Sequence, residues 1–333
     1  MLDRGVKSLF IIGLGLLAAG WIAAGPSFAQ QARPSITPRP KPASEIPESE
    51  RVTPNLRIDT NLVLIPVTVT TPLNQFVTGM ERKNFRLFEE KVEQEIAYFG
   101  SFDAPLSIGM VFDASGSMGS KLTKSREAAA QFFKKANPED EFFLVQFNDR
   151  PQLVMDFTRS TEEIQSRLTF TQAKGRTALL DGIYMALHHL KKGKNPRKAL
   201  LIVSDGGDNS SRYSESEVRN LLREADAQMY AMGIFESIGA RGRTAEEMAG
   251  PGLLDELAQM TGGRHFPVDN LNDLPDIAAK IGIELRNQYV LGYMSKNQVR
   301  DGKYRRVQVR LNQPRGMPPL RAIFRQGYYA PNQ

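Results

Sequence analysis

Residues 107–117 read S-I-G-M-V-F-D-A-S-G-S, a short apolar run that ends in Asp113 and continues with Ser115 and Ser117. Such a run is typical of a strand buried on both faces of a parallel sheet. Comparable runs recur along the chain with helical patterns between them, at 107–113, 141–147, 198–204 and 229–234. The alternation predicts an α/β fold, doubly wound around a mostly parallel six-stranded sheet.

The remaining elements of this domain follow from the same patterns. A strand is expected at 264–268, and the segment 153–157 follows the second strand so closely that it should form an antiparallel edge. The expected helices lie near 121–136, 178–192, 214–228, 252–261 and 274–287.

The sequences on both sides of the α/β region have residue patterns typical of β-strands. On the N-terminal side the runs fall within 62–70, 84–88 and 94–99, and on the C-terminal side within 289–294, 304–311 and 320–324. Neither flank is large enough to bury a core by itself. We therefore expect the two flanks to pair into one small flanking β-domain, with the α/β domain inserted between them.

The N-terminus resembles an export signal. Arg4 and Lys7 precede an apolar run, Pro26 interrupts it, and S-F-A at 27–29 suits signal peptidase. We expect cleavage after Ala29, with an uncleaved membrane anchor as the alternative. The protein should then be periplasmic, secreted or on the cell surface.

The expected organisation has five parts. A signal peptide at 1–29 is followed by a proline-rich linker at 30–55, an N-terminal β segment at 56–100, the α/β domain at 101–288 and a C-terminal β segment at 289–333.

The composition excludes several classes of chemistry. The chain has 333 residues, 41% of them hydrophobic, so it is not wholly disordered. It has no cysteine, which excludes a disulfide scaffold, a cysteine-ligated metal centre and a thiol nucleophile. With three histidines, any metal site must use mainly oxygen ligands. The net charge of +6 suits acidic surfaces or simple solubility, and we expect no nucleic-acid partner.

Polar side chains gather where the predicted strands end. Asp113, Ser115 and Ser117 follow the first buried strand, Asp205 follows the third, and Thr177 stands just before a helix. Ligands of open α/β sheets bind at this edge. Two carboxylates and three hydroxyls are hard ligands of low total charge, which suits Mg²⁺ or Mn²⁺. The alternative is a set of polar turns that cap helices.

This set resembles the metal-ion-dependent adhesion site of von Willebrand factor type A (VWFA) domains. Two further segments are similar to sequences of the same family: G-R-T-A-L-L-D-G-I at 175–183 and L-I-V-S-D-G-G-D-N at 201–209. Over residues 56–330, phrases such as V-T-V-T, N-F-R-L-F-E and Y-V-L-G-Y resemble secreted bacterial "VWFA-related" proteins of acidobacterial type.

The resemblance implies a role for each of the five side chains. Ser115 and Ser117 would coordinate the cation directly, Thr177 directly or through water, and Asp113 and Asp205 mostly through water. Because these ligands are mostly neutral, the cation would stay electrophilic and keep one position for a carboxylate of a partner protein.

The residue types at the site favour binding over catalysis. The short sequence segments that contain the five ligands hold no His, Glu or Lys that could act as a general base. Ser115 also lacks the first glycine of the G-x-S-x-G motif of serine hydrolases. We expect no catalytic residues and no organic cofactor. The expected function is an exported adhesion or interaction module that captures an Asp or Glu of a partner. A metal-dependent hydrolase, a structural envelope protein and association with a membrane surface remain open.

Neighbouring polar residues have simpler expected roles. We expect Asp208 to cap a helix or lie in a solvated loop, Asp181 to favour a helix N-terminus, and Asn148-Asp149 to form a hairpin turn. We also expect the site to lie at the surface, so that Asp113→Ala leaves the fold intact.

Overall fold

The computed structural model describes residues 62–101, 104–235, 245–313 and 316–332. The predicted signal peptide and linker, and the start of the N-terminal β segment, lie outside these residues. Within the described ranges, no helix is long and apolar enough to cross a bilayer.

The α/β domain is built on one six-stranded sheet in the order β10-β9-β8-β5-β6-β7. Neighbouring strands pair in parallel, except that β7 runs antiparallel to β6 at one edge. This confirms the predicted doubly wound sheet. The strands are β5 (Leu106–Asp113), β6 (Glu141–Phe147), β7 (Pro151–Thr158), β8 (Arg197–Ser204), β9 (Gln228–Ile234) and β10 (His265–Val268).

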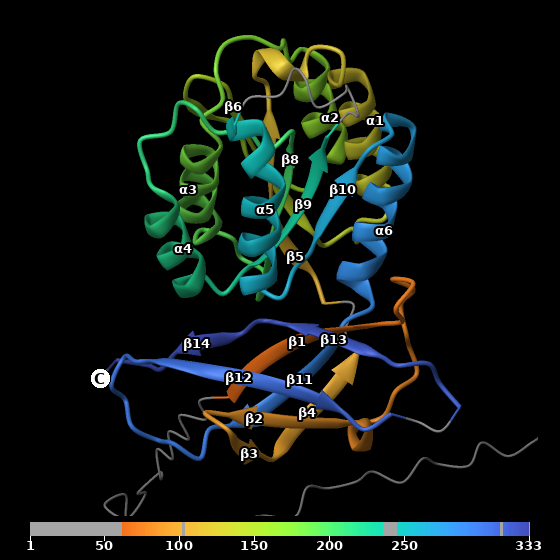
Figure 1. The fold of residues 1–333 in the computed structure, drawn as a ribbon, viewed down its shortest axis with the longest axis vertical. Coiled ribbons are helices and arrows are strands. Elements are labelled where there is room, and N and C mark those ends of the chain that lie inside the picture. The colour runs from red at the N-terminus through yellow and green to blue at the C-terminus, as the bar shows by residue number, and fades with distance from the viewer. Residues whose placement is uncertain (1–61, 102–103, 236–244, 314–315, 333) are drawn as a thin grey trace, which may run out of the picture. The chain divides into compact units, whose positions relative to one another are not determined.

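Helices cover both faces of this sheet (Figure 1). One hydrophobic core lies under α1 (Leu122–Phe133), α2 (Thr161–Thr169) and α6 (Leu274–Arg286). The other lies under α3 (Leu179–Leu190), α4 (Glu215–Glu224) and α5 (Ala245–Met260). Three differences from the sequence prediction concern helices: α2 was not predicted, α5 begins before 252, and α4 ends before 228 because Gln228 already belongs to β9.

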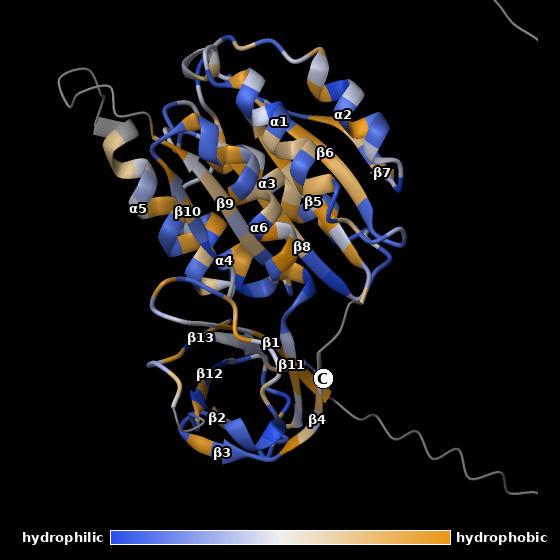
Figure 2. Cartoon of the chain, turned by 90° about the vertical axis from the view of Figure 1, so that its right-hand side faces the viewer, coloured by the Kyte–Doolittle hydropathy of each residue, from blue (hydrophilic) through white to orange (hydrophobic). Residues whose placement is uncertain are grey.

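The central strand β5 shows why the sheet forms. All eight of its residues are buried. Met110 and Phe112 pack into one core and Val111 packs into the other, so alternate side chains fill opposite faces. Figure 2 shows hydrophobic residues along the strands of this sheet.

The flanking strands form two four-stranded antiparallel sheets around a common hydrophobic core. In the first, the order is β13-β1-β11-β4, and in the second it is β14-β12-β2-β3. Each sheet mixes N-terminal and C-terminal strands, which confirms the flanking β-domain. The strands are β1 (Leu62–Thr70), β2 (Phe85–Glu89), β3 (Val92–Gln94), β4 (Ile96–Ser101), β11 (Tyr289–Met294), β12 (Tyr304–Leu311), β13 (Arg321–Phe324) and β14 (Gly327–Tyr329).

A buried glutamate links the two sheets of the β-domain. Glu89, at the end of β2, is 2% exposed and accepts hydrogen bonds from the hydroxyls of Tyr293 (2.7 Å) and Tyr328 (2.8 Å). It also forms a 3.4 Å ion pair with Arg305 of β12. The partners come from three further strands, so this one carboxylate ties together segments far apart in the sequence.

The β-domain contacts the α/β domain through buried polar groups. Gln288, between α6 and β11, donates to the hydroxyls of Thr68 and Tyr230, each at 3.1 Å. Thr68 belongs to β1 and Tyr230 to β9, so one amide joins the two domains. These contacts lie near the amino end of the parallel strands, because Tyr230 is the third residue of β9.

Candidate metal centre

Two neighbouring parallel strands bring the two predicted carboxylates to the same edge. Asp113 is the last residue of β5, and Asp205 directly follows β8. The strands pair in register, with Phe112 beside Val203. Ser204, the last residue of β8, donates through its hydroxyl to Asp113 Oδ2 at 2.6 Å. The strand-end prediction for Asp113 and Asp205 therefore agrees with their positions in the structure.

The loop after β5 folds its hydroxyls back onto the strand end. The Ser115 amide donates to Asp113 Oδ1 at 2.8 Å, and a short 3-10 turn, η3 (Gly116–Met118), follows. The hydroxyls of Ser115 and Ser117 share a hydrogen bond of 3.1 Å. Met118 is fully buried and anchors the turn in the core. Three of the five predicted ligands are thus connected by direct hydrogen bonds.

The loop before α3 lies against both of the other loops. The Gly116 amide donates to the Gly175 carbonyl at 3.0 Å, and the Lys174 amide donates to Ala114 at 2.9 Å. On its other side, the Thr177 amide donates to Asn209 Oδ1 at 3.0 Å. Thr177 is 5% exposed. Hydrogen bonds of its backbone therefore hold the Thr177 loop between the Ser115 loop and the Asp205 loop, although no hydrogen bond in the described residues joins the Thr177 hydroxyl to the other four side chains.

The carboxylates that flank the site build its loops. Asp208 Oδ2 accepts from the Leu180 amide at 2.8 Å, so it caps α3 from another loop, as expected of a capping residue. Asp181 accepts from the amides of residues 212 and 213, and its role is to hold that loop as well as to stand at the start of α3. Asp149, in the β6–β7 hairpin turn, accepts from the Arg176 amide at 2.9 Å.

Burial sets the electrostatics of the site. Asp113 is 0% exposed, and burial, followed by the negative charge of Asp205, raises the pKa of Asp113 to about 7. The site was expected at the surface, and its Ser117 is exposed, but Asp113 itself is buried. Asp205 is 5% exposed, and its Oδ1 is buried without a hydrogen-bond partner. A buried carboxylate oxygen without a partner is costly unless a cation or its bound water satisfies it.

These residues fit a small hard cation. In the described residues, no cluster of three or more carboxylates and imidazoles is arranged for a metal. The donor set at this edge is instead rich in hydroxyls, with one partnerless oxygen on Asp205. Such a set can supply oxygen ligands to Mg²⁺ or Mn²⁺ but not the high charge that a tight site needs.

Sequence reasoning missed a lysine at the site. Lys121 Nζ donates to Asp205 Oδ2 at 3.0 Å, and its side chain is only 11% exposed. Lys121 lies outside the short segments that contain the five predicted ligands, so the sequence argument did not consider it. No periodic signal marks Lys121, because it immediately precedes α1 and reaches Asp205 only through the fold.

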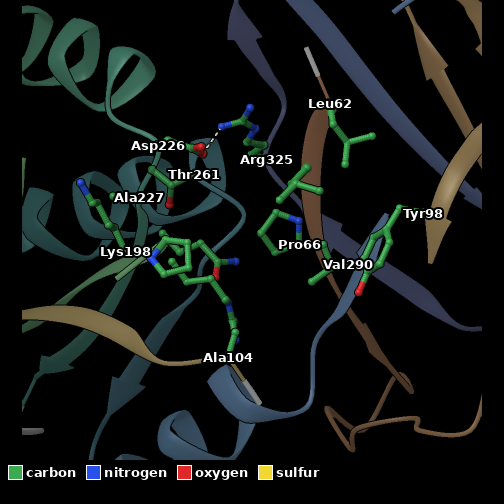
Figure 3. A pocket seen from close by; sticks show the side chains of 14 residues that line it. Leu62, Pro66, Tyr98, Ala104, Lys198, Asp226, Ala227, Thr261, Val290 and Arg325 are labelled. Atoms are coloured by element: carbon green, nitrogen blue, oxygen red, sulfur yellow. Dashed lines mark hydrogen bonds and ion pairs between the residues drawn. The ribbon is translucent and has the colours of Figure 1, made fainter. Parts of the chain in front are cut away.

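A largely apolar cavity lies elsewhere. It measures about 370 Å³ and is lined by residues of both domains (Figure 3). Leu64 and Val290 come from the β-domain, Lys198 is the second residue of β8, and Gln228 is the first residue of β9. Since Asp205 follows the other end of β8, the cavity and the candidate metal centre lie at opposite ends of the parallel sheet.

Fold and site together define a doubly wound α/β domain with a hydroxyl-rich, two-carboxylate centre at its strand ends. Residues 108–207 match the family model of the von Willebrand factor type A domain. The structure also resembles a von Willebrand factor type A protein from Catenulispora acidiphila, with a TM-score of 0.50 and 12% identity over 82% of this chain and 76% of that one. The α/β domain of this chain is a von Willebrand factor type A domain.

Curated relatives are similar over part of their length. Bovine inter-alpha-trypsin inhibitor heavy chain H4 is 27% identical over an alignment of 154 residues, which covers 40% of this chain and 17% of that protein. An uncharacterized protein of Borreliella burgdorferi is 26% identical over 188 residues, 50% of this chain and 55% of that protein. The chain thus covers less than two thirds of either relative.

Proposed function

We propose that this protein is an exported interaction module that binds Mg²⁺ or Mn²⁺ and captures a carboxylate of a partner protein. Von Willebrand factor type A domains are commonly protein-interaction modules, which supports the binding role. The export signal in the sequence supports the location. The metal ligands in this proposal are Asp113, Ser115, Ser117, Thr177 and Asp205.

One observation carries the proposal. The buried Asp205 keeps an oxygen without a partner beside the buried Asp113, on loops that also hold three hydroxyl side chains. Two close, desolvated carboxylates repel each other, and a divalent cation would relieve that repulsion. The hydroxyls would add ligands without adding charge, so the bound ion would still attract a partner carboxylate.

Each candidate ligand would have a distinct role in holding the ion. Ser115 and Ser117 would present their hydroxyls to the ion, and the Asp113 carboxylate, fixed by Ser204 and the Ser115 amide, would orient them. Thr177 would close the site from the neighbouring loop. The bound ion would supply the positive charge that a partner Asp or Glu recognises.

Calorimetry on the purified protein tests the metal site. We expect saturable binding of Mg²⁺, with tighter binding of Mn²⁺, and loss of both in Asp113→Asn. The matched control is Asp269→Asn, which changes an exposed carboxylate between β10 and α6 and should bind as the wild type does. Absence of binding by the wild type at millimolar Mg²⁺ and Mn²⁺ would refute the proposal.

Capture from the native envelope with and without chelator tests the partner. We expect one or more proteins to be retained with Mg²⁺, released by chelator, and lost with Asp113→Asn. Partners retained equally in both conditions would place recognition outside the candidate metal centre. A panel of hydrolase substrates, assayed with and without Mg²⁺, tests the alternative of a hydrolase, which metal-dependent turnover lost in Asp113→Asn would favour.

A further inference from the structure

Lys121 is fixed next to the candidate metal ligands. Its amide donates to the Met118 carbonyl at 2.9 Å, and its carbonyl accepts from both the amide and the hydroxyl of the buried Ser125, each at 3.0 Å. With its backbone held on both sides, the side chain reaches Asp205 and forms the 3.0 Å ion pair there. The same loop therefore supplies hydroxyls for a cation and a positive charge of its own.

The two carboxylate oxygens of Asp205 have different surroundings. Its Oδ2 accepts from Lys121, whereas its Oδ1 is buried without a partner. The other nearby carboxylates, Asp181 and Asp208, accept backbone amides and serve the loops. The charges at the centre are thus those of Asp113, Asp205 and Lys121, which sum to one negative charge when both carboxylates are ionised.

A divalent cation at this centre would meet like charge from Lys121. With the ion bound, the three side chains and the ion sum to one positive charge, whereas without Lys121 the sum would be zero. Repulsion between the ammonium and the ion lowers metal affinity, and the ammonium also competes for Asp205. The positive charge that remains is one that a single partner carboxylate would neutralise.

We propose that Lys121 is an internal competitor of the metal, which neutralises Asp205 in the metal-free protein and holds Mg²⁺ affinity low. The inference rests on the proposed metal site and adds the residue that sets its strength. When Mg²⁺ binds, the Lys121 ammonium must either break its ion pair with Asp205 or stay in place, where it repels the bound ion and weakens binding.

The test compares Mg²⁺ binding by wild type, Lys121→Met and Lys121→Arg, using calorimetry and melting temperature with and without chelator. Lys121→Met should bind Mg²⁺ about tenfold more tightly, or better, since the competing charge is gone. In chelator it should melt below the wild type, because Asp205 loses its counter-charge. Lys121→Arg keeps the charge and can donate two hydrogen bonds to a carboxylate, so its Mg²⁺ affinity should not exceed that of the wild type.

Lys124→Met is the matched control. Lys124 lies in α1, three residues after Lys121, and pairs at 2.8 Å with Glu127 rather than with a candidate ligand. Its removal should leave Mg²⁺ affinity unchanged, which separates a local effect from a general change in net charge.

The outcomes separate the two proposals. If the wild type and Lys121→Met both fail to bind metal, the proposed function is refuted and this inference with it. If the wild type binds and Lys121→Met binds equally or more weakly, the competitor role is refuted while the metal site stands. If Lys121→Met does not fold, Lys121→Arg decides, and tighter Mg²⁺ binding by that variant would overturn the inference.

Discussion

Replacing Asp113 by asparagine should stabilise the metal-free protein while abolishing metal binding. The Asp113 carboxylate is fully buried, and burial, followed by the charge of Asp205, raises its pKa from 3.8 to about 7. A rise of this size corresponds to about 4 kcal/mol of unfavourable free energy for the ionised form. Asparagine removes that charge and can still accept from the Ser115 amide. It pairs less well with Ser204, so we expect a net gain of about 1–3 kcal/mol at pH 8.

The gain should depend on pH with a defined sign. A carboxyl whose pKa is raised on folding binds its proton more tightly in the native state, so its contribution to stability is lost as pH rises from about 4 to about 7. The advantage of Asp113→Asn in chelator should therefore be larger at pH 8 than at pH 5. With Mg²⁺ the order should reverse, because ligand binding to the native state stabilises only the wild type.

Urea unfolding followed by circular dichroism measures these differences. Circular dichroism is preferred because the single tryptophan, Trp21, lies in the predicted signal peptide. Asp269→Asn, at an exposed site, should change stability by less than about 0.5 kcal/mol. If Asp113→Asn is less stable than the wild type at pH 8 in chelator, the reasoning about the buried carboxylate is wrong.

Three further predictions concern the rest of the fold. Glu89→Ala should cost about 3–5 kcal/mol in urea unfolding, because it removes the nearer and buried carboxylate partner of the buried Arg305. The exposed Glu93→Ala should cost less than about 1 kcal/mol, and similar losses for the two variants would contradict the role of Glu89. Deleting 289–333 removes the partners of β1 and β2 and should cause aggregation in size-exclusion chromatography, and a soluble monomer would show that the two β segments are independent. Burial lowers the pKa of His265 from 6.5, so the unfolded state binds the proton more tightly and stability should fall as pH drops below about 6.5. His265→Phe should lose less melting temperature between pH 7 and pH 5 than the wild type, and equal losses would refute this.

The sequence predicted most of the strands, though not β14 or a separate β3, because the signal of a longer strand is local. The buried strand β5 is a continuous apolar run, and β12 alternates apolar and polar residues, so each pattern is visible without the fold. Helix α2 was missed because only Ile164 and Leu168 are buried on it. Its start does carry a signal, since the Ser160 hydroxyl accepts from the amide of Glu163, three residues on.

The candidate ligands were predictable for a different reason. Asp113 and Asp205 stand at strand ends, and the parallel arrangement alone brings strand ends together. By contrast, the ion pair of Lys121 and the cap that Asp208 gives α3 join residues whose proximity depends on how loops pack. No spacing rule contains that information. The burial of Asp113 was missed for the same reason, because it results from the loops that close over the strand end.

The topology explains why the candidate metal centre is free of the β-domain. The chain enters the α/β domain from β4 into the start of β5 and leaves it from α6 into β11. In a parallel sheet every strand starts at the amino edge, and each connecting helix returns the chain there. Both connections to the β-domain therefore lie at the amino edge, where Gln288 joins the domains. Among the described residues, the carboxyl edge with Asp113 and Asp205 bears loops of the α/β domain itself, so a partner can approach it without displacing the β-domain.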